Sequence, residues 1–106
     1  MSNARKLWEV MVPCMMNGNP VRRKHHQNWD SMVRKVSHGL TLLAPAKGQW
    51  RNPDTQELVA ERVIPVRFIS TEKQMKQIAK FTLTHYNQHT VLIYKISDEV
   101  HFITNE

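Results

Sequence analysis

Apolar and polar residues alternate in several short segments of the chain, which predicts strands. Four segments have the length and the β-branched content typical of strands: residues 7–13 ("LWEVMVP"), 40–46 ("LTLLAPA"), 58–69 and 90–96 ("TVLIYKI"). Residues 99–103 ("EVHFI") follow the last of these after a tight turn and predict a terminal hairpin strand. Residues 47–57 ("KGQWRNPDTQE") are polar and rich in turn-forming residues, so they predict a long loop.

Two other segments repeat apolar residues with the helical period. The first, over residues 25–37 and closed by Gly39, has four core candidates at positions i, i+3, i+4 and i+7: Trp29, Met32, Val33 and Val36. The second begins at Thr71, which matches the capping-box pattern with Gln74, and ends near Tyr86. Its apolar face is made of Met75, Ile78, Ala79, Thr82, Leu83 and Tyr86.

The order of these elements is β-α-β-β-α-β followed by the hairpin strand. This order is typical of a ferredoxin-like α+β sandwich, in which two helices cover one face of an antiparallel sheet and leave the other face open. The sequence has no internal repeat and no obvious linker, so we expect a single domain over residues 1–106. Residues 1–5 are expected to be a flexible start or a remnant of cloning.

The third predicted strand carries a charge, Glu61, among apolar residues. Alternation places Ile64, Val66 and Phe68 on one face of this strand and puts four other residues on the opposite face: Val59, Glu61, Val63 and Pro65. If the first set faces the helices, Glu61 lies on the open face of the sheet. An open face with three apolar neighbours would be an exposed patch, which predicts that another subunit covers it.

Length and composition restrict the possible functions. A chain of 106 residues with 41% hydrophobic and 23% charged residues is globular, and it is too short to build a deep private cleft easily. An enzyme site in this chain is therefore expected at a boundary between subunits. The net charge of +6 excludes an acidic DNA mimic. Basic residues cluster only in "RRKHH", without interleaved aromatic residues, so nucleic-acid binding is not favoured.

Histidine and cysteine give weak signals. His85 and His89 have the i, i+4 spacing that puts two imidazoles on one helical face, but no acidic or cysteine ligand accompanies them, and no metal is predicted. Cys14 is the single cysteine, which excludes an intrachain disulfide and favours a reducing compartment. Cys14 paired with a histidine as a nucleophile is a weaker interpretation. No segment is long and apolar enough to predict a membrane span or a secretory signal.

Trp50 lies outside the periodic segments, in the polar stretch of residues 47–57. One interpretation is a loop anchor that packs over the core. The other is an aromatic wall for a planar or cationic ligand, where a cation on the ring would contribute about 0.5 to 2 kcal/mol. A cationic ligand would also explain why a carboxylate, Glu61, lies on the same side of the sheet.

Three segments together resemble the phage-encoded S-adenosylmethionine lyases, formerly called S-adenosylmethionine hydrolases: "RKHHQNWDSMVRKVSHGLTLLAPAKGQW", "AERVIPVRF" and "THYNQHTVLIYKISDEVHF". The similarity covers nearly the whole chain from Leu7 to Phe102, in order and with compatible spacing. The resemblance implies a ferredoxin-like subunit that forms a homotrimer with sites between subunits. It also implies cytoplasmic action in an infected bacterial host, where loss of S-adenosylmethionine counters restriction.

The resemblance implies roles for particular residues. The essential acidic residue of the family corresponds to Glu61, and an active-site tyrosine corresponds to Trp50, eleven residues earlier. This departure keeps an aromatic surface but removes a phenol hydroxyl. Val59 and Val63 flank Glu61 on its face and are expected to contact the substrate. No cofactor is expected, because a sulfonium is already a good leaving group.

Three functions stay open from the sequence. The leading one is an S-adenosylmethionine lyase, with hydrolysis as the second possible chemistry. A basic ferredoxin-like module that binds nucleic acid through Arg22, Arg23 and Lys24 without catalysis is the alternative. An oligomeric enzyme or small-ligand binder that acts on another compound is the third.

Overall fold

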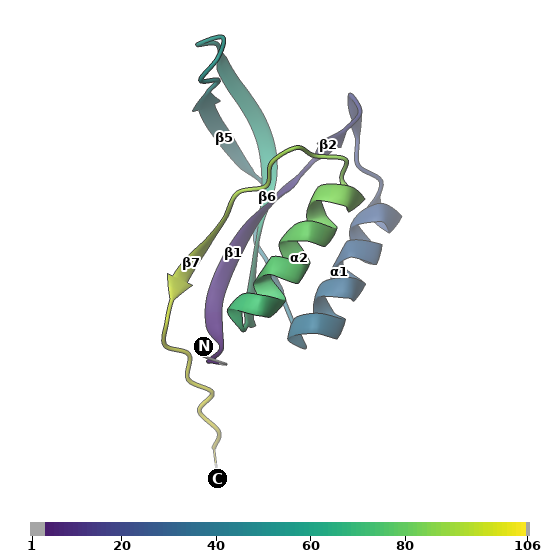
Figure 1. Cartoon of the computed structure of the whole chain (residues 1–106). Coiled ribbons are helices and arrows are strands. Elements are labelled where there is room, and N and C mark those ends of the chain that lie inside the picture. The colour runs from purple at the N-terminus through teal and green to yellow at the C-terminus, as the bar shows by residue number, and fades with distance from the viewer. Residues whose placement is uncertain (1–3, 106) are drawn as a thin grey trace.

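In the computed structural model, which describes residues 4–105, two helices cover one face of an antiparallel sheet (Figure 1). This α+β arrangement confirms the predicted ferredoxin-like fold class. The elements in chain order are β1 (Lys6–Pro13), β2 (Met15–Met16), β3 (Asn19–Pro20), α1 (Arg23–Ser37), β4 (Thr41–Leu42), β5 (Ala46–Arg51), β6 (Leu58–Ser70), α2 (Glu72–His85) and β7 (Ile93–Ser97).

The long strand β6 organises the sheet. Its C-terminal half lies between β4 and β1, and β7 pairs with the other edge of β1, which gives the order β4-β6-β1-β7. Its N-terminal half pairs with β5 instead. The β5–β6 hairpin, residues 46–63, extends beyond the helices as an arm (Figure 1). Strands β2 and β3 form a separate small hairpin.

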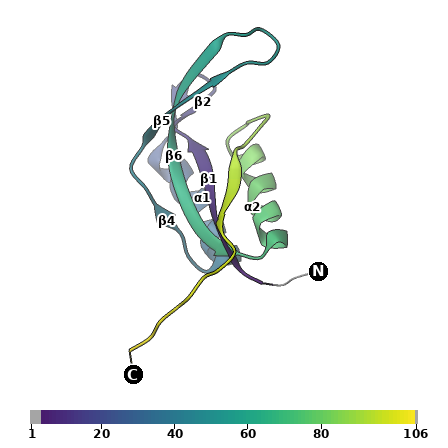
Figure 2. The ribbon, with the colours of Figure 1, turned by 90° about the vertical axis from the view of Figure 1, so that its left-hand side faces the viewer.

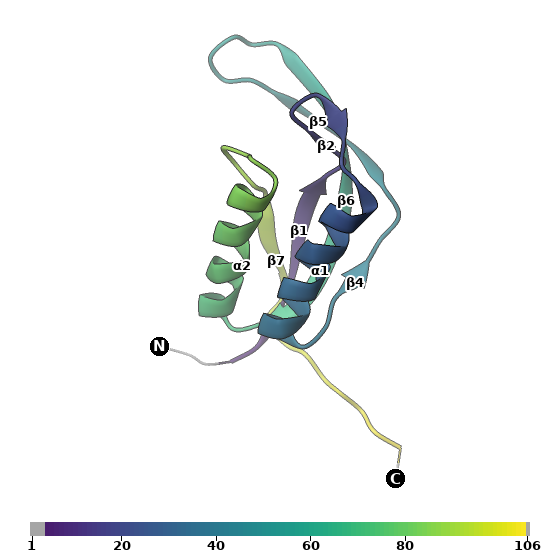
Figure 3. The ribbon, with the colours of Figure 1, turned by 90° about the vertical axis from the view of Figure 1, so that its right-hand side faces the viewer.

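The core lies between the sheet and the helices, which stand in front of the sheet in Figure 3. The sheet contributes Trp8, Val10, Val12, Val66 and Phe68, and the helical layer contributes Trp29, Val33, Ile78 and Tyr86. The indole of Trp29 donates a hydrogen bond to the hydroxyl of Thr82 over 2.9 Å, so its buried N–H is satisfied. The buried Trp29 and Val33, and the partly buried Met32 and Val36 beside them, confirm the predicted face of α1.

The ends of the helices follow from local chemistry. Thr71 and Gln74 form the predicted capping box, with reciprocal side-chain to backbone hydrogen bonds of 3.2 and 3.0 Å. Helix α2 ends at the predicted position, with Tyr86 as its C-cap. Helix α1 ends at Ser37, as predicted, but His38 and not Gly39 adopts the left-handed conformation that closes it, with φ of 69°.

Two sequence predictions about strands are wrong. The predicted loop over residues 47–57 contains strand β5 and a turn, so Trp50 lies on a strand. The predicted hairpin strand over residues 99–103 is absent, because residues 99–105 leave the body without pairing (Figure 2). Nothing in the described chain covers Phe102 or Ile103, so this tail has no apolar surface on which to fold.

Two other strands are shorter than predicted. In the 40–46 segment only Thr41 and Leu42 join the sheet as β4. Pro45, which has no N–H to donate, separates β4 from β5. The predicted strand over residues 90–96 begins three residues later, as β7. Residues 1–3 of the expected flexible start lie outside the described residues, while Arg5 donates hydrogen bonds to the carbonyls of Ser37 and Ile69.

Candidate functional site

Strand register decides which way Glu61 faces. On β6, Val66 and Phe68 are buried in the core against the helices. Glu61 lies an odd number of positions from both, so it belongs to the opposite, open face of the sheet, as the alternation predicts. Figure 2 shows this face, with the helices behind it.

The arm brings Trp50 and Glu61 to one face. Trp50 pairs with Val59 and Gly48 pairs with Glu61, so the three side chains of Trp50, Val59 and Glu61 lie on the same side of the hairpin. The turn of the arm is fixed by Asn52, whose side-chain oxygen accepts hydrogen bonds from the backbone N–H groups of Asp54 and Thr55. Trp50 is 47% exposed, so it is not an anchor packed over the core.

A cavity of about 690 Å³ lies at the root of the arm. Its volume is within the range of small-molecule sites. Trp50, Glu61 and Val63 line it, whereas Val59 does not. The remaining wall is formed by the loop between α2 and β7, residues 87–92, which crosses the root of the arm in Figure 1. The lining residues are Met11, Pro13, Ala46, Lys47, Gly48, Gln49, Trp50, Glu61, Val63, Pro65, Asn87, Gln88, His89, Thr90, Val91 and Leu92.

The loop that closes this cavity is attached to the small β2–β3 hairpin. Asn87, which has a left-handed backbone with φ of 51°, donates a side-chain hydrogen bond of 2.8 Å to the side-chain oxygen of Asn17. The N–H of Met11 also bonds to the carbonyl of Leu92 over 3.1 Å. These two bonds hold one end of the loop to the small hairpin and the other end to β1.

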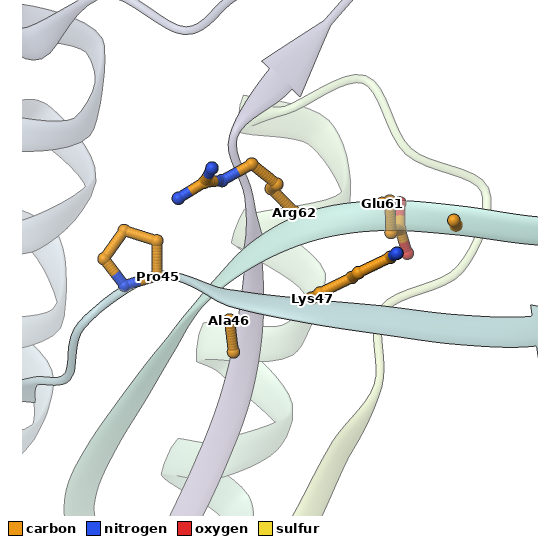
Figure 4. A pocket seen from close by; sticks show the side chains of 6 residues that line it. Pro45, Ala46, Lys47, Glu61 and Arg62 are labelled. Atoms are coloured by element: carbon orange, nitrogen blue, oxygen red, sulfur yellow. The ribbon is translucent and has the colours of Figure 1, made fainter.

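A smaller cavity of about 460 Å³ lies beside the first and shares Glu61 with it (Figure 4). Its charged lining residues are Lys47, Glu61 and Arg62. None of these three side chains makes a salt bridge or a side-chain hydrogen bond within residues 4–105. The charges at the root of the arm are therefore available to a ligand.

A second carboxylate, Glu9, lies on the open face and was missed in the sequence. It is 5% exposed, accepts a hydrogen bond of 2.9 Å from Arg67 Nε, and accepts another from the Tyr94 hydroxyl. Because both carboxylate oxygens are satisfied, this group joins strands β6, β1 and β7 rather than offering a free charge. The signal that could have identified it is a glutamate inside the apolar "LWEVMVP", the same signal that singled out Glu61.

The exposed apolar surface of the open face differs from the one expected. Val63 and Pro65 are already buried within the chain, so they do not form the predicted exposed patch. Tyr94, which pairs with Glu9, and Leu92, two positions earlier, are exposed on this face instead. The exposed Ile96 follows them at an irregularity in the pairing of β7 with β1. An exposed apolar row on an uncovered sheet face still favours an assembly that covers it.

The histidines form structural contacts. His25 and His85 stack with ring centroids 3.8 Å apart, and a ring nitrogen of each lies within hydrogen-bond distance of the other's carbonyl. His85 is therefore engaged between the helices, and His89 lies beyond the end of α2, in the cavity loop. No group of three or more potential metal ligands occurs among residues 4–105. The absence of a metal requirement stays a prediction.

Cys14 is a poor candidate nucleophile. Burial raises the pKa of its thiol, and the nearby Arg62 offsets only part of this effect. The thiolate, which is the reactive form, is thus disfavoured.

The residues that sequence reasoning missed belong mainly to β5 and the 87–92 loop. The residues of "AKGQWR" do alternate between two faces, with Gly48 and Trp50 on one face and three polar residues on the other: Lys47, Gln49 and Arg51. This pattern does not indicate a strand in the sequence, because an arm that is exposed on both faces has no apolar side. Neither helix in the described part of the chain is long and apolar enough to cross a membrane.

Comparisons with known proteins identify the fold. No protein-family model and no curated protein sequence matches the chain. Among solved structures, CutA1 from Shewanella sp. SIB1 aligns with a TM-score of 0.70 and 7% identity over 96% of this chain and 88% of its own. The divalent cation tolerance protein CutA1 from Thermus thermophilus aligns with a TM-score of 0.66 and 7% identity, over 87% and 82% of the two chains.

A phage S-adenosylmethionine lyase in complex with S-methyl-5′-thioadenosine also aligns with the chain. Its TM-score is 0.64 with 12% identity, and the alignment covers 92% of each chain. At these identities the similarity of all three structures concerns the fold alone.

Proposed function

We propose that the protein degrades S-adenosylmethionine by intramolecular lactonisation, releasing methylthioadenosine and homoserine lactone. The observation that carries this proposal is the 690 Å³ cavity, in which an unpaired carboxylate, Glu61, and an exposed indole, Trp50, face the same space. The fold-level similarity to a phage S-adenosylmethionine lyase supports the proposal.

The substrate and the cavity are chemically compatible. S-adenosylmethionine carries a sulfonium, an α-ammonium, an α-carboxylate and a planar adenine. An aromatic surface such as Trp50 stacks on adenine or accepts a cation on its face. Glu61 supplies the negative charge that an ammonium requires. Val63 and Pro65 form an apolar floor, which limits the access of water to the reacting carbon.

The reaction needs geometry more than reactive groups from the protein. An oxygen of the substrate carboxylate forms a bond to the γ-carbon while the bond between that carbon and sulfur breaks. The bonding electrons pass to sulfur, so the sulfonium becomes the neutral thioether of methylthioadenosine. The lactone keeps the α-ammonium, and no proton is exchanged. Holding the substrate folded for this attack is the main catalytic device.

Glu61 is the group we assign to catalysis, by holding the α-ammonium in the folded conformer. Hydrolysis is the second possible chemistry, in which Glu61 would activate a water molecule as a base. Trp50 stands where the family has a tyrosine, so a role that depends on a phenol hydroxyl is not part of this proposal. Val59 does not line the cavity, and we assign it to support of Trp50 across the hairpin.

We further propose a homotrimer with sites between subunits. The exposed residues Leu92, Tyr94 and Ile96 supply an apolar surface for a neighbouring copy, which would close the open side of the cavity. In this account the protein acts in the cytoplasm of an infected bacterium, where the depletion of S-adenosylmethionine disarms restriction systems that need it.

A basic module that binds nucleic acid is the second candidate. Arg22, Arg23 and Lys24 are exposed near the start of α1, and none of them makes a salt bridge within residues 4–105. Such binding would be weak and would fall steeply with salt.

One assay separates these functions. The purified protein is incubated with S-adenosylmethionine, with and without a chelator, and the products are separated by chromatography. The proposal expects methylthioadenosine, with homoserine lactone appearing before homoserine, whether or not the chelator is present. Homoserine formed directly would indicate hydrolysis. Unchanged S-adenosylmethionine, together with salt-sensitive RNA binding, would favour the second candidate.

A further inference from the structure

Two unpaired, opposite charges border the same space at the root of the arm. Lys47 and Glu61 both line the large and the small cavity, whereas Arg62 lines only the small one. Within the described residues neither Lys47 nor Glu61 has a salt-bridge partner, and they do not pair with one another. A carboxylate and an ammonium that share a cavity without neutralising each other are arranged for a ligand that carries both charges.

Strand geometry explains how the two groups reach one space. Gly48 is the cross-strand partner of Glu61, and Lys47 precedes it on β5. Strand β5 is an edge strand, paired only with β6, so the long side chain of Lys47 can extend round its free edge. Figure 4 shows the side chain of Lys47 running along β5 with its amine end on the side of Glu61. The absence of a side chain at Gly48 leaves room between the charges.

We infer that Lys47 and Glu61 form a subsite for the zwitterionic head group of an α-amino acid, with Lys47 on the carboxylate and Glu61 on the ammonium. This inference rests on the proposed function and names the part of the substrate that the arm selects. A head group with both charges makes two charge-assisted hydrogen bonds at once, and a ligand that lacks the head group makes neither. Trp50, further along the same face as Glu61, is left for the planar part of the ligand.

The assignment also defines the role of Lys47 in the reaction. It is a positioning residue, because it holds one carboxylate oxygen while the other is directed at the γ-carbon. An ammonium bound to a carboxylate lowers the nucleophilicity of that carboxylate, so Lys47 contributes to capture and orientation more than to the chemical step. Its loss is therefore expected to raise KM more than it lowers kcat.

The test compares two ligands that differ in the head group. S-adenosylhomocysteine carries the complete amino-acid head but lacks the sulfonium needed for cleavage, and methylthioadenosine lacks the head. Calorimetry measures the affinity of both for the unaltered protein and for Lys47→Gln, Lys47→Arg and Arg51→Gln. Arg51 is the control, because it lies on the same face of β5 as Lys47 but lines neither cavity.

Lys47→Gln is expected to lower the affinity for S-adenosylhomocysteine roughly tenfold or more, which is the range for a lost hydrogen bond to a charged group. Methylthioadenosine is expected to bind Lys47→Gln and the unaltered protein with equal affinity. Lys47→Arg is expected to restore the preference for the ligand with the head group. Arg51→Gln is expected to leave both affinities unchanged. Equal effects of Lys47→Gln on both ligands, or no effect on either, would overturn the inference, even if the unaltered protein cleaves S-adenosylmethionine. A Lys47-dependent preference without any cleavage would keep the inference and refute the proposed function. Binding of neither ligand would refute both.

Discussion

Trp50 and Glu61 face the same side of the β5–β6 hairpin, because Trp50 pairs with Val59 and Gly48 pairs with Glu61. Residues on one face of a strand recur every second position, so the indole and the carboxylate lie at neighbouring positions on adjacent strands. Both line the large cavity. This relationship places an aromatic surface and a negative charge where one cationic, planar ligand can contact both.

Replacement of Trp50 tests the aromatic half of this arrangement. Trp50→Ala is expected to weaken the binding of methylthioadenosine roughly 2- to 10-fold, the range for loss of an aromatic stacking partner of the adenine. The affinity of Trp50→Tyr for methylthioadenosine is expected to stay near that of the unaltered protein, because tyrosine keeps an aromatic ring. The thermal midpoint should be unaffected, since Trp50 is half exposed and lies outside the core. Calorimetry measures the affinity and thermal melts measure the midpoint. If Trp50→Ala binds methylthioadenosine as tightly as the unaltered protein, Trp50 does not contact the ligand.

A side chain added at Gly48 should block the cavity without unfolding the protein. The nearest atom to a Cβ at this position is the Glu61 carbonyl oxygen at 3.8 Å, which is ordinary contact, so Gly48→Val is tolerated by the backbone. The added methyl groups occupy the space beside Glu61, and ligand affinity is expected to fall roughly tenfold or more.

Gly39→Val is the matched control for Gly48→Val. A Cβ at Gly39 meets nothing within 4 Å, and Gly39 lines neither cavity. Its affinity for methylthioadenosine should match that of the unaltered protein. If Gly48→Val binds as tightly as Gly39→Val, the ligand does not lie between Gly48 and Glu61.

The sequence alone predicts the helices and the face of Glu61, because core periodicity and capping chemistry are local signals. Trp29 and Val33 on one helical face, and the Thr71–Gln74 capping box, needed no tertiary information. Strand β5 could not be recognised in this way. Its residues project into solvent on both sides, and only pairing with β6 makes them a strand.

The missed features of the site share one physical cause. Lys47 and the 87–92 loop come together with Glu61 only through contacts between distant parts of the chain, and no local pattern records them. Residues 99–103 show the opposite case, because their alternation predicts a strand but no strand within residues 4–105 pairs with them. Alternation predicts the tendency to form a strand, and pairing decides the outcome.

Acid is expected to destabilise the packing of the two helices. Burial lowers the pKa of His26, the neighbouring His25 and His85 add to this, and Asp30 opposes it. The neutral imidazole Nδ1 of His26 lies 2.7 Å from the hydroxyl of Tyr86, whose pKa is raised by burial, so the hydroxyl stays protonated and donates. Near pH 6.5 the unfolded chain therefore binds more protons than the folded one, and stability falls as the pH is lowered from about 7 to 5.

The control for this pH dependence is a second histidine. His26→Gln should flatten the fall in thermal midpoint between pH 7 and pH 5, because it removes the group with the lowered pKa. His101→Gln should leave the fall unchanged, since this side chain is 73% exposed. Identical pH profiles for the unaltered protein and His26→Gln would show that another group is responsible.

The assembly is tested on the open face. The unaltered protein is expected to scatter light as a trimer at micromolar concentration, because the exposed side chains of Leu92, Tyr94 and Ile96 favour a covered face. Ile96→Asp should shift the mass towards the monomer, since it places a charge in that surface without touching either cavity. Ser31→Asp, on the exposed side of α1, should leave the measured mass unchanged. A stable monomer of the unaltered protein would contradict the shared-site account.

Turnover of S-adenosylmethionine by the unaltered protein and by Glu61→Gln tests the central claim most directly. The substitution keeps the size of the side chain and removes its charge, and Glu61 is exposed and unpaired, so the fold should be retained. The measurement is the initial rate of methylthioadenosine release at equal protein concentration, followed by chromatography. The account predicts a loss of roughly 100-fold or more in Glu61→Gln, within the range for positioning and acid–base groups. Equal rates for the two proteins would contradict it.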